Sequence, residues 1–172
     1  AGLESAEGFN DEARAAVRWT KDTLTTANTA FLSALPERLL TRHGALLVHG
    51  APDDRDRYLW DKSDLRAEAV SLRESGEAEV CFFGHTHLPV LAGEDQVLDG
   101  DLAKHGLAPD QGWLINPGSV GQPRDGDPRA SYAVWRTGKQ AGKREIEFRR
   151  VVYDISRAQG RIEKAGLPDW LA

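Results

Sequence analysis

Two short apolar runs that each end in glycine and histidine limit what this chain can fold into. "GALLVHGAP" (44–52) leads to His49, and "EVCFFGHTH" (79–87) leads to His85 and His87. Runs of this length, rich in Val, Leu and Phe and bounded by Gly or Pro, are typical of buried strands. A helical pattern separates the two runs. Ligands collect at the C-terminal ends of strands in layered α/β folds, so we expect the three imidazoles to converge there.

Further elements follow from the same kind of pattern. Residues 10–34 indicate one or two helices with Asn10 as N-cap, and Pro36 ends their apolar stripe. The helix at 63–76 is expected to begin with Ser63 as cap and to end at Gly76. More strands are expected at 96–100, 112–119, 130–137 and 144–154, followed by a helix at 155–166. This order predicts an α/β layered architecture with a partly antiparallel sheet.

Composition narrows the class of protein. A length of 172 residues suits one domain, so we expect a single domain over 1–172. A net charge of -5 does not favour a surface for nucleic acid or anionic membrane. No apolar stretch approaches the roughly 18 residues that a membrane span needs. Cys81 is the only cysteine, which predicts a reducing, cytoplasmic setting, and the absence of methionine predicts a piece of a longer protein.

The histidines admit two interpretations on their own. Neutral imidazole is a common ligand for Zn, Mn or Fe, and no cysteine cluster suggests a structural zinc site. A single histidine at a strand end, however, is more often a hydrogen-bonded packing residue, and a bare His-x-His does not decide between the two. His43 and His105 lie in polar surroundings and are expected at the surface.

Three blocks in order resemble the C-terminal half of the calcineurin-like metallophosphoesterases, and most closely the compact bacterial phosphodiesterases and phosphatases. The blocks are "LLVHGAP", "FFGHTHLPV" and "LINPGSVGQPRDGDPRASYAVW", and the match runs from about Leu46 to Trp135. The resemblance implies an α-β-β-α sandwich with a two-metal centre at the strand ends. It also implies a hydrolase that cleaves a phosphomonoester or phosphodiester, from a small molecule or a nucleotide, with metal-activated water.

The resemblance further implies a site. His49 and His85 would bind one metal and His87 the other, the metals being Mn, Fe, Ni or Zn. The residues expected to line the substrate are Asn116, Gly118, Ser119 and Arg124. Arg129 is expected to be a solvated loop residue instead.

The chain also departs from the family pattern. It has no Asp-x-His and no Gly-Asn-His, and Gly-Asp occurs only at 100–101 and 126–127, after the GHTH block. We expect the missing motifs upstream of residue 1. Three neutral imidazoles bring no carboxylate to bridge two dications, so these 172 residues alone predict weak or absent metal binding and no catalysis. The sheet would also lack strands, which predicts an exposed sheet edge. A non-catalytic scaffold and a mononuclear His₃ site therefore stay open as alternatives.

The loop after the first run carries several charged and aromatic residues. Asp53, Asp54 and Asp56 alternate with arginines, which predicts local ion pairs in a solvated loop and not a metal site. Tyr58 and Trp60 are expected either to pack this loop down or to line one wall of a substrate cleft.

Overall fold

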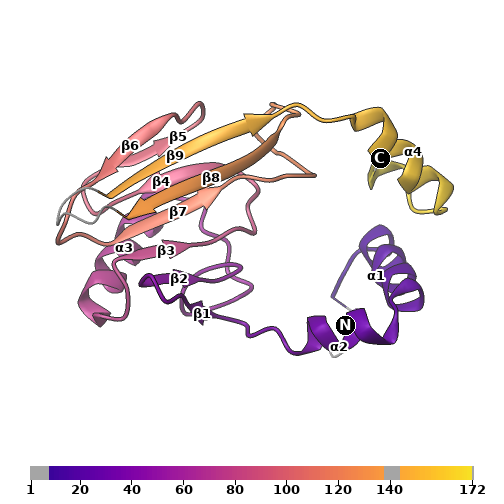
Figure 1. Ribbon diagram of the computed structural model, residues 1–172, viewed down its shortest axis with the longest axis horizontal. Helices are drawn as coiled ribbons and strands as arrows, with labels where there is room; N and C mark the ends of the chain where they lie inside the picture. The colour runs from indigo at the N-terminus through magenta and orange to yellow at the C-terminus, as the bar shows by residue number, and fades with distance from the viewer. Residues whose placement is uncertain (1–7, 138–143, 172) are drawn as a thin grey trace. The chain divides into compact units, whose positions relative to one another are not determined.

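The computed structural model describes residues 8–137 and 144–171, and these residues divide into two units. The helical unit takes its residues from 8–36 and 153–171, and the sheet unit from 37–137 and 144–152. Figure 1 shows the elements of both units along the chain. All of the predicted site residues belong to the sheet unit.

The helical unit contains α1 (Asp11–Thr23), α2 (Thr26–Ser33), α4 (Ile155–Lys164) and the short 3-10 helix η1 (Asp169–Leu171). As expected, Asn10 caps α1, its side chain accepting a 2.8 Å hydrogen bond from the amide of Ala13. Thr25 caps α2 in the same way and so divides the predicted stripe into two helices. Across 8–137 and 144–171, no helix combines the length and apolar character that crossing a membrane requires.

The larger sheet of the sheet unit has the strand order β1-β2-β3-β7-β4-β5. The strands are β1 (Leu39–Leu40), β2 (Ala45–Leu47), β3 (Val80–Phe82), β7 (Trp113–Pro117), β4 (Pro89–Ala92) and β5 (Val97–Asp99). β2, β3 and β7 are parallel, whereas β1, β4 and β5 are joined by antiparallel pairing. The mixed sheet expected from the sequence is therefore confirmed, and β2 and β3 end on the same side.

The smaller sheet has the order β6-β9-β8. It is antiparallel and consists of β6 (Lys104–Leu107), β9 (Arg144–Val151) and β8 (Ala130–Thr137). Within the residues that the structure describes, β8 pairs along one side only. Sequence patterns missed β1, β4 and β6, because β1 has two residues, β4 begins at a proline and β6 reads "KHGL".

Alternation along the central strands builds the layers. Ala45, Val80 and Ile115 pack toward the smaller sheet, where they meet Ile146 and Phe148. The intervening residues pack into a second core with α3 (Lys62–Ser75); they are Leu46, Cys81 and Leu114 on the strands and Leu65, Ala69 and Leu72 on the helix. This period of two is that of a strand buried on both faces. Figure 1 shows the resulting order of α3, larger sheet and smaller sheet.

The ends of α3 were predicted only in part. Gly76 ends the helix in the left-handed conformation (φ 66°), as expected. The N-cap is Asp61 and not Ser63, which lies within the first turn. The helix also approaches the sheet very closely, since a Cβ at Gly112 would lie 1.8 Å from the carbonyl oxygen of Ala69. Glycine is needed there because any side chain would collide with the helix backbone.

Candidate active site

The structure brings the histidines of the two apolar runs together at the ends of β2 and β3. The ring centroids of His49 and His85 are 4.5 Å apart, with an angle of 53° between the ring planes. The amide of Gly84 donates a 2.8 Å hydrogen bond to the carbonyl oxygen of His49, which ties the two loops together. The parallel pairing of β2 with β3 therefore places both imidazoles in one place, as the sequence predicts.

The GHTH turn has an unusual backbone. His85 and His87 both adopt left-handed conformations, with φ values of 64° and 61°. The amide of Thr86 donates a 2.7 Å hydrogen bond to the carbonyl oxygen of Gly84, and Thr86 itself is buried. Left-handed residues other than glycine are uncommon and occur often at functional sites, where the surrounding structure holds them.

The buried side chain of Asn116 supports the GHTH turn through hydrogen bonds. Its side chain is fully buried, and its amide nitrogen donates to the carbonyl oxygen of Gly84 (2.8 Å) and to the hydroxyl of Thr86 (3.0 Å). Its side-chain oxygen accepts a 2.9 Å hydrogen bond from the amide of Gly118. With no exposed surface, Asn116 connects β7 to the GHTH turn and supports it; its expected substrate-lining role stays a prediction.

Two histidines have one ring nitrogen held by a backbone carbonyl. Nε2 of His85 lies 3.2 Å from the carbonyl oxygen of Asp56, and Nδ1 of His87 lies 2.8 Å from the carbonyl oxygen of Gln122. A proton on each of these nitrogens leaves Nδ1 of His85 and Nε2 of His87 as acceptors. Metal-binding histidines characteristically have this arrangement, in which an outer partner fixes the tautomer and the orientation of the ring.

The turn that follows β7 shapes the other side of the site. The hydroxyl of Ser119 accepts a 3.0 Å hydrogen bond from the amide of Gln122, and this closes the turn that places the Gln122 carbonyl against His87. Gly118 is left-handed (φ 85°), and a Cβ there would come within 2.8 Å of Oγ of Ser131. Arg124 is exposed, and among the described residues its side chain has no hydrogen-bond or ion-pair partner.

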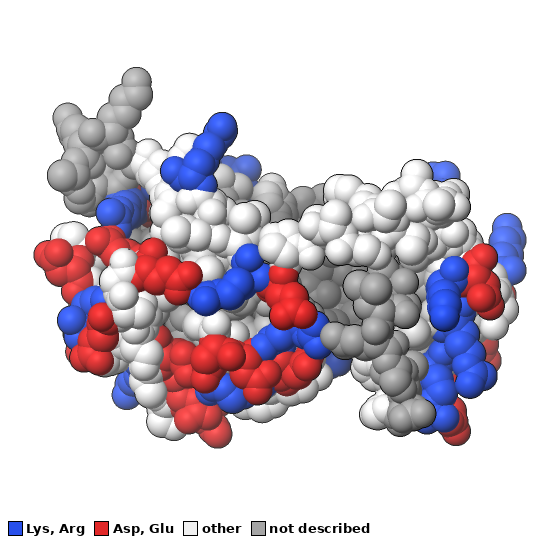
Figure 2. Space-filling model, turned by 90° about the horizontal axis from the view of Figure 1, so that it is seen from below, with Lys and Arg blue, Asp and Glu red and all other residues white. Residues whose placement is uncertain are grey.

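The charged loop after His49 forms the expected ion pairs. Arg57 pairs with Asp53 at 2.5 Å and with Glu68 of α3, while Arg55 pairs with Glu37 at 2.9 Å. Figure 2 shows acidic and basic side chains interspersed on the face of the sheet unit that it presents. Arg129, which the sequence predicts to be a solvated loop residue, forms an ion pair with Asp127 at 2.5 Å.

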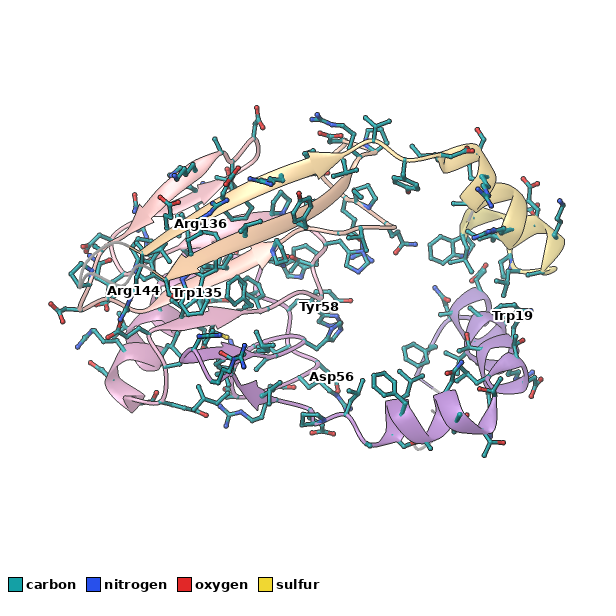
Figure 3. The ribbon with its side chains drawn as sticks, in the orientation of Figure 1. Trp19, Asp56, Tyr58, Trp135, Arg136 and Arg144 are labelled. Atoms are coloured by element: carbon teal, nitrogen blue, oxygen red, sulfur yellow. The ribbon has the colours of Figure 1, made fainter. Side chains whose placement is uncertain are left out.

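Tyr58 contacts one of the histidines directly, whereas the sequence left open whether it packs its loop down or lines a substrate cleft. Its ring stacks on His85, with centroids 3.6 Å apart and an angle of 19° between the planes. Figure 3 shows Tyr58 and Asp56 at one end of the sheet unit and Trp135 and Arg144 toward the other. Asp56 and Gln122 were also missed, because both act through the backbone carbonyl and the residue type therefore gives no signal.

Electrostatics favour the neutral form of His49. Partial burial of its ring lowers the pKa below its usual 6.5, and the charge of His85 lowers it further. Asp56 acts in the opposite direction. Neutral imidazole is the form that binds a metal. The donor set is nevertheless incomplete, because within 8–137 and 144–171 no group of three or more His, Cys, Asp or Glu side chains is placed to hold a metal ion.

A cavity of about 620 Å³ lies elsewhere in the sheet unit. His43, Glu79, Asp110, Trp135 and Arg144 are among its lining residues, and none of the predicted site residues is. Arg144 pairs with Glu79 across it. The cavity is therefore separate from the histidine site.

Comparison with known proteins identifies the class of this fold. The crystal structure of a metallophosphoesterase from Sphaerobacter thermophilus superposes with a TM-score of 0.73 at 32% identity, covering 99% of this chain and 69% of that one. An uncharacterized protein of Methanocaldococcus jannaschii is 34% identical over 173 residues, which cover 99% of this chain and 68% of that protein. The fold is thus that of the metallophosphoesterases.

Residues 5–140 match the calcineurin-like phosphoesterase superfamily domain, and the chain belongs to this superfamily. The resemblance drawn from the three sequence blocks is confirmed. Membership indicates a hydrolase of phosphate esters with small-molecule substrates, in a family that generally uses divalent metal ions.

Proposed function

We propose that the protein is a metal-dependent phosphoesterase in which His49, His85 and His87 are metal ligands. The observation that carries this proposal is the 4.5 Å approach of the His49 and His85 rings at the ends of adjacent parallel strands. The carbonyl partners of His85 and His87 add support, because they leave one nitrogen of each ring available.

The proposed roles follow this geometry. His49 and His85 would bind one ion and His87 a second, with Mn, Fe, Ni or Zn as the metal. Bound metal would supply a water of lowered pKa and polarise the phosphoryl group. Arg124 would bind phosphate oxygens through paired N–H donors, beside Gly118 and Ser119.

The three proposed ligands lack the negative charge that a dinuclear metal centre needs. Three neutral imidazoles bring no negative charge, and a dinuclear centre uses carboxylates to bridge and neutralise its ions. We infer that carboxylates beyond the described donor set complete the centre. The same proposal treats 1–172 as part of one phosphoesterase domain and places it in the cytoplasm, the setting suggested by its lone free cysteine.

Metal analysis and hydrolysis together test the proposal. Metal content is measured by mass spectrometry for the chain and for a form that includes any residues preceding Ala1 in the gene. Hydrolysis of bis-p-nitrophenyl phosphate is followed with Mn²⁺ in both. We expect close to two metal ions per chain wherever hydrolysis occurs. The substitution His85→Ala should lower the metal content and abolish hydrolysis. His43→Ala is the control, since His43 is exposed and lines the separate cavity.

Other outcomes would select the alternatives. Hydrolysis that His85→Ala leaves unchanged would contradict the ligand assignment. One metal per chain would indicate a mononuclear His₃ site. Metal content near zero in both forms would favour a non-catalytic scaffold, the candidate that the incomplete donor set of the described residues supports.

A further inference from the structure

Three aromatic rings form a stacked series that leads from the histidine site to the surface. Tyr58 lies nearly parallel to His85, with ring centroids 3.6 Å apart, and nearly parallel to Trp60, with centroids 5.1 Å apart and an interplanar angle of 6°. Two rings cannot occupy one face of Tyr58 at these distances, so His85 and Trp60 lie on opposite faces. The series therefore runs His85, Tyr58, Trp60.

Both Tyr58 and Trp60 are exposed to solvent. Tyr58 is 39% exposed and Trp60 is 52% exposed, whereas Leu59 between them is buried in the core with α3. The buried Leu59 is thus flanked on both sides by an exposed aromatic residue. Tyr58 has ring neighbours on both faces, whereas Trp60 ends the series with half of its surface exposed.

The segment that carries the rings is firmly held. The loop folds over Gly50, where a Cβ would lie 2.4 Å from the carbonyl oxygen of Arg55. Arg57 fastens the segment through its ion pairs with Asp53 and with Glu68 of α3. A fixed and exposed aromatic surface binds a planar ring with little loss of conformational entropy, because it is already ordered.

We propose that Trp60 and Tyr58 form a stacking subsite for a planar aromatic group of the substrate. On the proposed function, which this inference requires, the preferred phosphate ester is one whose alcohol portion is a nucleoside. Its phosphate lies at His49, His85 and His87, and its base stacks on the outer face of Trp60, which Tyr58 supports from the inner side. Every base has a π face, so this subsite favours nucleosides over aliphatic alcohols without selecting one base.

Trp60 provides a direct test because it contacts Tyr58 and not His85. Binding of adenosine 5′-monophosphate and of ribose 5-phosphate is measured by calorimetry with Mn²⁺ present. Because the two ligands share the sugar phosphate, their affinity ratio isolates the base. We expect the wild-type chain to prefer the nucleotide about tenfold, and Trp60→Ala to abolish this preference while ribose 5-phosphate binding is unchanged. Trp60→Phe should restore part of it.

Tyr132→Ala is the matched control for Tyr58→Ala, because Tyr132 is 36% exposed on β8, outside the stacked series. It should keep the preference that Tyr58→Ala loses. Equal affinity of the wild-type chain for the two ligands, absence of nucleotide binding, or a preference unaffected by Trp60→Ala would each overturn the subsite.

Hydrolysis separates this inference from the function on which it rests. The p-nitrophenyl ester of thymidine 5′-monophosphate and methyl p-nitrophenyl phosphate release the same product and differ in the nucleoside. A higher kcat/KM for the nucleoside ester that Trp60→Ala removes supports both proposals. Equal rates without a binding preference leave the phosphoesterase function standing and overturn the subsite. A Trp60-dependent binding preference supports the subsite; if the form that includes any residues preceding Ala1 in the gene then hydrolyses neither ester, the phosphoesterase function is contradicted.

Discussion

The amide of Gly84 donates a hydrogen bond to the carbonyl oxygen of His49, and this 2.8 Å contact joins the two histidine loops through their backbones. Asn116 adds two more hydrogen bonds from behind, to Gly84 and Thr86. The relative position of His49 and His85 is therefore fixed by the sheet and its hydrogen bonds. A site held in this way has its imidazoles in place before a ligand binds, which lowers the entropic cost of binding.

Asn116 should be important for stability. Replacing it with alanine removes its hydrogen bonds to Gly84 and Thr86, takes away the partner of the Gly118 amide and opens space at a fully buried position. We therefore expect Asn116→Ala to lower the free energy of unfolding by about 2–4 kcal/mol. Urea denaturation measures this change. Asn28→Ala, at an exposed helix position, should change it by no more than about 0.5 kcal/mol. Equal effects of the two substitutions would contradict the supporting role of Asn116.

The close contact between α3 and β7 makes a second prediction. A methyl group at Gly112 would collide with the carbonyl oxygen of Ala69, so Gly112→Ala should destabilise the fold by about 2–3 kcal/mol. Gly106→Ala is the control, because a Cβ there meets nothing within 4 Å. Thermal and urea unfolding of the two variants should differ clearly, and similar unfolding curves would show that α3 can move away from the sheet.

Cys81 should be chemically inert in the folded chain. It is completely buried on β3, and burial raises the pKa of its thiol to about 12. The thiolate is the reactive form, so 5,5′-dithiobis(2-nitrobenzoic acid) at pH 8 should react very slowly with native protein. In urea one thiol per chain should react at once. Rapid reaction without denaturant would show that β3 opens readily.

Glu147 should contribute to stability at neutral pH and lose this contribution in acid. Hydrogen bonds from Arg149 and Arg136 lower its pKa from 4.5 to about 2. A carboxyl whose pKa is lower in the folded state stabilises that state above its unfolded pKa, and the effect disappears as the pH falls through the folded value. The difference in urea midpoint between wild type and Glu147→Gln should therefore be largest above pH 4.5 and vanish near pH 2.

Glu163→Gln serves as the control for this titration, because Glu163 is an exposed residue on α4. Its urea midpoint should follow the wild-type midpoint at every pH. A Glu147→Gln difference that stays constant from pH 7 to pH 2 would show that the arginine contacts do not act through the ionised carboxylate.

Sequence patterns located the elements that carry the site because those elements obey simple periodicities. β2, β3 and β7 are buried on both faces and appear as continuous apolar runs. The sequence gives little sign of β1, which exists only through its pairing with β2, or of β6, whose residues are mostly polar. Tertiary pairing creates such strands, so residue preference alone does not reveal them.

The same distinction applies to the site. His49, His85 and His87 could be selected from their residue type and their position after apolar runs. The partners of their rings could not, because Asp56 and Gln122 contribute carbonyl groups that every residue has. The burial of Asn116 and its hydrogen bonds to the GHTH turn could not be predicted either, since they depend on how β7 packs beside β3.

The left-handed conformations of His85 and His87 lower the stability of the folded chain. Each costs about 1 kcal/mol or more that glycine would not cost, since glycine adopts positive φ freely. The most stable version of this turn is therefore one that cannot perform the proposed chemistry. Selection for thermostability alone, without selection for activity, would be expected to erase the motif by which the family is recognised.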